Sequence, residues 1–147
     1  MRYLKKYNES LDSSEEILEF CNDQLVSLLD DGYCVRVTKF RVKDKESLSD
    51  AYSISIQSKY DIRDLNGYNN RDYFFTYKDV KDEFVPFYEI LKNKYEIVDI
   101  YNEDNETSGC AEIVCETEEV SLTESDIYND DYECDEIINI YINIKVK

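Results

Sequence analysis

Histidine is absent from this 147-residue sequence, and glycine occurs only three times and proline once. Without histidine the chain has no imidazole base, no Ser–His or Cys–His nucleophile pair and no histidine metal ligand. With so few glycines there is no glycine-rich loop to cradle a phosphate. No run of about 18 apolar residues occurs, so no membrane-spanning helix is expected, and no apolar segment follows the first lysines as in a secretory leader. These absences predict a non-enzymatic cytoplasmic protein with no catalytic residues, cofactor or metal.

The cysteines are five in number and include no Cys-x-x-Cys pair. An odd count without an export signal predicts reduced thiols rather than a disulfide framework. An all-cysteine zinc site lacks the usual ligand spacing. We therefore expect core or edge packing for all of them, namely Cys21, Cys34, Cys110, Cys115 and Cys134.

The net charge of −17 is unevenly distributed along the chain. Residues 1–94 hold 18 acidic and 15 basic residues, whereas residues 95–144 hold 16 acidic residues and no lysine or arginine. The densest part, which we call the acidic segment, is 116–136, with ten acidic residues. A basic cluster lies early in the chain, at Arg36, Lys39, Arg41, Lys43 and Lys45. The two halves are complementary in charge, which permits self-association.

Two periodicities in the apolar residues predict the secondary structure. Ile17, Cys21, Leu25 and Leu28 form one helical stripe, and alternate residues from Ile138 to Val146 form one face of a strand. The parity of apolar residues changes midway through 33–42, which predicts a bulge near Thr38–Lys39, before a long turn over 43–50. The expected elements are helices at 13–30 and within 73–95, and strands at 33–42, 51–58, 95–102, 109–116 and 136–146.

The order of these elements, α-β-β-α-β-β-β, is typical of a two-layer α+β domain. We expect a mainly antiparallel sheet of about five strands with two helices on one face. Residues 1–11 are interpreted as a basic N-terminal leader. Residues 12–147 are interpreted as a single domain with an acidic insertion at about 116–136.

The acidic segment has three interpretations. It is a solvated loop that keeps the protein soluble, or a surface whose carboxylates imitate the phosphates of DNA, or a divalent-cation site. The third is disfavoured because "NEDNE" and "NDDYECDE" do not match the DxDxDG loop. The candidate partner-binding residues of this segment are Glu116, Glu118, Glu119, Asp130 and Asp131.

The opening "MRYLKKYNES" carries three basic residues against one acid. It docks either on the domain's own acidic half or on a partner, and the candidate residues are Arg2, Tyr3, Lys5 and Lys6. It resembles the Met-Lys-x-Leu-Lys-x-Phe-Asn-Glu openings of uncharacterised proteins of tailed bacteriophages. The stretch "YKDVKDEFVPFYEILKNKYEI" resembles a segment of small phage proteins. The resemblance implies a phage origin and, through such leaders, an association with the phage head, and it transfers no functional residue.

The leading functional hypothesis is a non-enzymatic protein-binding protein with a virion-associated or assembly role. Its partner would be a phage structural protein or a second copy of the chain, with no direct contact to nucleic acid or membrane. Its location would be the cytoplasm of the bacterial host, or the virion. The alternative is an acidic, DNA-mimic-like inhibitor of a host nucleic-acid-binding defence or transcription protein. An unrelated enzyme or immunity protein stays open as a third hypothesis.

Overall fold

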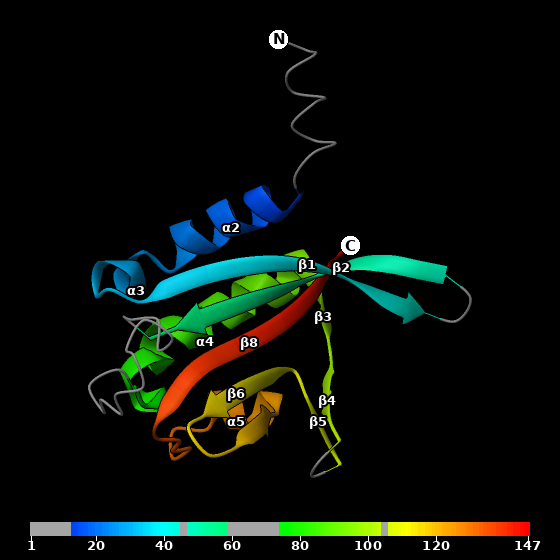
Figure 1. Ribbon diagram of the computed structural model, residues 1–147. Helices are drawn as coiled ribbons and strands as arrows, with labels where there is room; N and C mark the ends of the chain where they lie inside the picture. The colour runs from blue at the N-terminus through cyan, green and yellow to red at the C-terminus, as the bar shows by residue number, and fades with distance from the viewer. Residues whose placement is uncertain (1–12, 45–46, 59–73, 104–105) are drawn as a thin grey trace, which may run out of the picture.

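The computed structural model describes residues 13–44, 47–58, 74–103 and 106–147 (Figure 1). The helices are α2 (Ser13–Gln24), α3 (Val26–Asp30), α4 (Tyr77–Lys94) and α5 (Glu124–Tyr128). The strands are β1 (Cys34–Asp44), β2 (Ser47–Gln57), β3 (Tyr95–Val98), β4 (Ile100–Asn102), β5 (Thr107–Gly109), β6 (Ala111–Cys115), β7 (Glu119–Leu122) and β8 (Ile137–Val146). Helices combined with antiparallel strands confirm the predicted α+β class.

The predicted first helix forms as two helices, α2 and α3, that meet at Leu25. Leu25 has φ −111° and ψ 27°, but its N–H still donates to the Cys21 carbonyl at 2.9 Å, so the apolar stripe continues. Gly32 adopts φ 95° just after α3. The next N–H, of Tyr33, donates back to the Leu28 carbonyl at 3.0 Å. This is a Schellman motif, which ends a helix at a glycine because glycine tolerates positive φ.

β1 and β2 keep one antiparallel register along their whole length. The prediction of a bulge near Thr38–Lys39 was therefore wrong, and most of the predicted turn over 43–50 belongs to the strands. The apolar parity changes at Phe40 and Val42 because these residues lie where the hairpin extends beyond the main sheet. β8 pairs with β2 only over Tyr52–Gln57, so the far end of the hairpin is a two-stranded ribbon.

α4 begins where Thr76 caps it. The Thr76 hydroxyl accepts from the Asp79 N–H at 3.2 Å, and the Asp79 carboxylate accepts from the Thr76 N–H at 2.9 Å, a reciprocal capping box. Pro86 lies on the exposed side, and the helix continues past it to Lys94. The opposite side is buried. The helical spacing of Val80, Phe84, Phe87 and Leu91 places them on it, and Tyr77 and Tyr88 are buried beside them.

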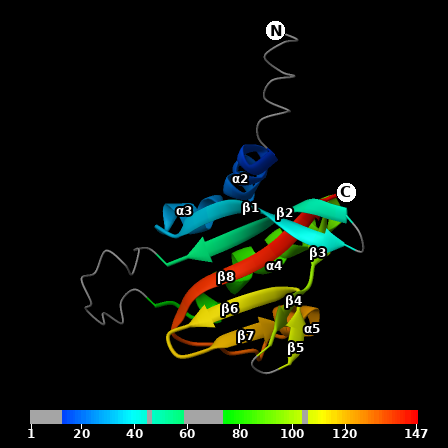
Figure 2. The ribbon, with the colours of Figure 1, turned by 45° about the vertical axis from the view of Figure 1, so that its right-hand side comes forward.

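β8 occupies the centre of the six-stranded sheet, whose order is β1-β2-β8-β6-β7, with β3 also paired to β8. One edge of β8 pairs with β2. Its other edge pairs with β3 at Val146 and with β6 at Ile137, so β3 and β6 lie end to end along it. The β4–β5 hairpin leaves the sheet between them (Figure 2). The predicted strands over 95–102 and 109–116 are thus each divided in two.

A bulge in β8 corrects the predicted inner face of that strand. Val114 of β6 lies opposite Asn139, but Cys115 lies opposite Ile137, so Ile138 is skipped. Ile137 is completely buried, whereas Ile138 is only partly buried. The alternation therefore places Ile137, not Ile138, in the core.

The two long helices, α2 and α4, pack into one hydrophobic core with the inner face of the sheet. The rings of Phe20 in α2 and Tyr95, the residue that follows α4 and begins β3, meet edge to face, with centroids 5.8 Å apart. The sheet contributes mainly Tyr52, Ile54 and Ile56 of β2 and Ile140, Ile142 and Ile144 of β8. This arrangement holds β6, and the acidic segment that follows it and contains β7 and α5, against a packed core.

Candidate acidic interface

The acidic segment is folded into the domain rather than looped out from it. β7 pairs with β6, and α5 follows directly. Thr123 and Asp126 form a capping box at the start of α5, with hydrogen bonds of 3.1 and 3.2 Å. Leu122 and Ile127 have no exposed surface. Because Leu122 and Ile127 are buried, β7 and α5 anchor the segment, and its carboxylates lie on these two elements and on the turns that flank them.

A groove of about 450 Å³ opens at the turn between β6 and β7. Three of the candidate residues line it, Glu116, Glu118 and Glu119, and all three are exposed. The remaining lining residues are Asn102, Val114, Cys115 and Thr117. The sequence prediction therefore named three carboxylates that the fold brings around one concave surface.

Hydrogen bonds to main-chain carbonyls tie the walls of this groove to the rest of the domain. The Cys115 N–H donates to the Glu118 carbonyl at 2.8 Å across the turn. The Glu116 N–H donates to the Glu136 carbonyl, at 3.2 Å, in the segment that leads to β8. The Asn102 side chain in β4 donates to the Glu119 carbonyl, also at 3.2 Å. The carboxylates of the groove are consequently displayed from a backbone that is anchored on three sides.

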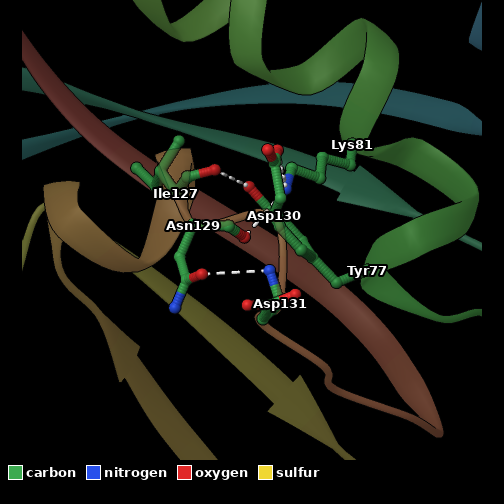
Figure 3. Close-up of polar contacts among 6 residues, drawn as sticks. All are labelled: Tyr77, Lys81, Ile127, Asn129, Asp130 and Asp131. Carbon is green, nitrogen blue, oxygen red and sulfur yellow. Dashed lines mark hydrogen bonds and ion pairs between the residues drawn. The ribbon is translucent and has the colours of Figure 1, made fainter.

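Asp130 and Asp131, the other two candidates, lie after α5 beside α4 (Figure 3). The Asp130 carboxylate is 3.1 Å from the Lys81 ammonium, which also donates to the Asn129 carbonyl at 2.8 Å. The Asp131 N–H donates to the Asn129 side chain at 2.9 Å. In the same cluster the Tyr77 hydroxyl donates to the Ile127 carbonyl at 2.9 Å (Figure 3). Here the segment docks on α4, and Lys81 offsets the charge of Asp130.

The groove carboxylates have no such compensation. Within the described ranges no lysine or arginine forms an ion pair with Glu116, Glu118 or Glu119. Nearby, burial and then the Glu119 carboxylate raise the pKa of Glu112 on β6. Burial is also the main reason that the pKa of Tyr132 rises to about 12, and the Cys134 thiol and Asp126 add to it. These shifts are what a region of low dielectric and uncompensated negative charge produces.

The leader candidates, Arg2, Tyr3, Lys5 and Lys6, lie outside the described residues. The basic cluster of the first strand is described for the most part, and it lies on the β1–β2 hairpin at the opposite edge of the sheet from β7. Lys39 and Arg41 both contact Asp50, at 3.4 and 3.8 Å, and Lys43 is exposed. Lys39, Arg41 and Lys43 therefore lie on the edge strand farthest from the groove in the sheet order, and the first two share the carboxylate of Asp50.

A second pocket, of about 370 Å³, lies between α4 and the start of α5. In it the Tyr88 hydroxyl donates to the Glu124 carboxylate at 2.9 Å, and the Lys92 ammonium lies 3.4 Å from the same carboxylate. The hydrogen bond from Tyr88 and then the contact with Lys92 lower the pKa of Glu124. Burial raises the pKa of the neighbouring Cys110 thiol. These shifts make the Glu124 carboxylate a weaker base and disfavour the thiolate form of Cys110.

Sequence reasoning did not find this second pocket. Tyr88 and Lys92 share one side of α4, but Glu124 and Cys110 come from elements far along the chain. Only the four-residue spacing of the tyrosine and the lysine was visible beforehand, and such spacing is common on helices. The cluster is a product of the tertiary fold.

No family model, curated protein or solved structure matches this chain. None of the helices in the described residues has the length and hydropathy needed to cross a bilayer. The same residues contain no group of three or more cysteine or acidic side chains arranged to hold a metal ion. The candidate site therefore has to be interpreted from its own geometry.

Proposed function

We propose that this chain is a non-enzymatic protein-binding protein, and that the groove at the β6–β7 turn binds a basic surface of its partner. One observation carries the proposal. Glu116, Glu118 and Glu119 surround a groove of about 450 Å³ on a hydrogen-bonded framework, and no cation of the described chain pairs with them.

The energetics of such a groove favour a cationic occupant. Carboxylates held close together repel one another, and this repulsion is relieved when lysine or arginine side chains of a partner enter. The uneven charge of the whole molecule adds steering, since residues 95–144 lack any basic residue. Exposed ion pairs contribute about 0.2–1 kcal/mol each, so three carboxylates contribute roughly 0.6–3 kcal/mol, or about a three- to hundredfold change in Kd.

A basic site on a nucleic-acid-binding protein fits this chemistry best. Such sites are lined by lysine and arginine and are built to receive regularly placed negative charge. The groove carboxylates are fixed to the start of β7 and to the turn that joins it to β6, so they present a defined pattern in place of phosphates. The role that follows is inhibition by occupying the partner's site.

A second candidate role is assembly, and the β1–β2 hairpin favours it. The end of the hairpin that carries Arg41 and Lys43 projects beyond the part paired with β8, and Lys39 lies opposite Tyr52, where that pairing ends (Figures 1 and 2). The hairpin of one copy would enter the groove of the next in a head-to-tail contact, which repeats along a chain of copies. A phage structural protein with a similar basic element would bind in the same way.

The test is capture of partners from bacterial lysate, with and without phage lysate, followed by washes of rising salt. The variant combines Glu116→Gln, Glu118→Gln and Glu119→Gln. The control combines Glu19→Gln, Asp23→Asn and Glu89→Gln, which remove the same charge from exposed positions on α2 and α4. We expect the unmodified chain and the control to retain a partner that the groove variant loses.

The identity and salt response of the captured protein separate the two roles. The screening length falls from about 10 Å at 0.1 M salt to about 3 Å at 1 M. A partner that is bound by exposed charges should therefore elute between these two salt concentrations. A host nucleic-acid-binding protein supports the inhibitor role, and a phage structural protein or the chain itself supports assembly. Equal retention by the groove variant and the unmodified chain contradicts the proposed interface.

A further inference from the structure

Cys115 and Cys134 place their sulfur atoms 3.5 Å apart. Cys115 ends β6 and is buried, whereas Cys134 lies between α5 and β8 and is partly exposed. The backbone holds both positions. The Cys115 N–H donates to the Glu118 carbonyl at 2.8 Å, and the Tyr77 N–H of α4 donates to the Cys134 carbonyl at 2.9 Å. The proximity of the two thiols therefore follows from the fold.

The two thiols are close to bonding distance. A disulfide has a sulfur–sulfur separation of about 2.05 Å, so the sulfur atoms need to approach by about 1.5 Å. We propose that Cys115 and Cys134 form a site of covalent oxidation, which takes a cationic or neutral disulfide as its oxidant and closes an intramolecular disulfide around residues 116–133.

The surrounding charge decides which oxidant reaches the site. Burial raises the pKa of Cys115 to about 12 and also raises the pKa of Cys134, and the Glu118 carboxylate adds to both shifts. Asp135 acts on Cys134 and Glu136 on Cys115 in the same direction. Negative charge of this kind repels an anionic disulfide such as oxidised glutathione and attracts a dicationic one such as cystamine. The site thus discriminates oxidants by charge.

Cys134 is the residue that reacts first. It is the more exposed of the two, and once it is deprotonated the Cys115 thiol, 3.5 Å away, can donate a hydrogen bond to its thiolate. The Cys134 thiolate attacks one sulfur of cystamine, forms a mixed disulfide and releases one cysteamine thiol, which carries away the proton. The Cys115 thiolate then attacks the Cys134 sulfur and releases the second cysteamine. Two protein thiols are oxidised, and one cystamine disulfide is reduced to two thiols.

The disulfide would enclose β7, α5 and the groove residues Glu116, Glu118 and Glu119 within one covalent loop. A cross-link of this kind restricts the loop in states where the surrounding structure opens. In its effect on binding, this inference rests on the proposed function, because oxidation would hold the groove in its partner-binding shape. The oxidation itself does not depend on that function.

The experiment uses the full chain with Cys34→Ser, because Cys34 is an exposed thiol that would form mixed disulfides of its own. The protein is treated with cystamine or with oxidised glutathione at low and high salt, alkylated, weighed intact and mapped by peptides. We expect the loss of two hydrogens and a peptide linked through Cys115 and Cys134. Cystamine should react several-fold faster than glutathione disulfide at low salt, and the difference should shrink near 1 M salt.

Other outcomes would overturn the proposal. A stable cysteamine adduct on Cys134 without loss of two hydrogens shows that Cys115 does not resolve it. If a protein that also carries Cys134→Ser yields the same cross-linked mass, the disulfide does not involve Cys134 and the proposal is wrong. Equal rates for the two oxidants at low salt refute the selection by charge. The lysate capture is repeated with the oxidised chain. If the mapped disulfide leaves retention of the partner unchanged, the link between oxidation and binding is wrong. The proposed function is tested separately, by whether the groove variant loses the partner.

Discussion

Gly109 ends β5, where the β4–β5 hairpin packs against the backbone of β7. A Cβ atom at this position would lie 2.6 Å from the Leu122 carbonyl oxygen, 2.9 Å from its nitrogen and 3.0 Å from its carbonyl carbon. All three are backbone atoms, so no side-chain rotation can relieve the overlap. Gly109→Ala therefore has to move the hairpin away from β7 by about 0.8 Å to reach the 3.4 Å of an ordinary contact.

The cost of that movement follows from the hydrogen bonds that the Leu122 carbonyl accepts. The Cys110 N–H donates to the Leu122 oxygen at 3.0 Å, and the Cys110 thiol donates to it at 3.4 Å. A retreat of about 0.8 Å takes the main-chain bond beyond hydrogen-bonding range, which costs about 1 kcal/mol. Strain from the added methyl group costs about 1–3 kcal/mol more. The free energy of unfolding should fall by about 2–4 kcal/mol.

Thermal unfolding followed by circular dichroism measures this loss. For a chain of this size, 2–4 kcal/mol lowers Tm by roughly 5–15 °C. The control is Ser108→Ala, an exposed neighbour in the same strand, for which we expect a change within about 0.5 kcal/mol. If Gly109→Ala melts within about 1 °C of the unmodified chain, the hairpin does not pack on β7 as described.

Two further predictions concern single side chains. Tyr77→Phe removes the buried hydrogen bond to the Ile127 carbonyl and should lower the free energy of unfolding in urea by about 1–2 kcal/mol. The matched change Tyr101→Phe, at a side chain that is 59% exposed, should change it little. Glu112 has a raised pKa, so the folded state binds its proton more tightly than the unfolded state, and stability falls as the pH rises above the unfolded value of about 4.3. Glu112→Gln should therefore be more stable than the unmodified chain at pH 7 and equal to it below about pH 4, and a lower stability at pH 7 would contradict this reasoning.

Local sequence determined the parts of the fold that depend on periodicity and capping. The stripe of Ile17, Cys21, Leu25 and Leu28 was sufficient to place the first helical region, because helical spacing and the stop at Gly32 are both local. The alternation in β8 and the apolar face of α4 were visible for the same reason. The concentration of acidic residues after residue 95 was likewise plain from the sequence.

Only the tertiary structure decided which of those acidic residues share a surface. Glu116 and Glu119 line the groove, whereas Asp130 pairs with Lys81, since α5 turns the chain back onto α4. The division of the strands after Tyr95 was also beyond sequence reasoning, because β3 and β6 pair with a strand that occurs later in the chain. The same pairing brings Cys115 beside Cys134. Such contacts join residues far apart in the sequence, and no local pattern encodes their register.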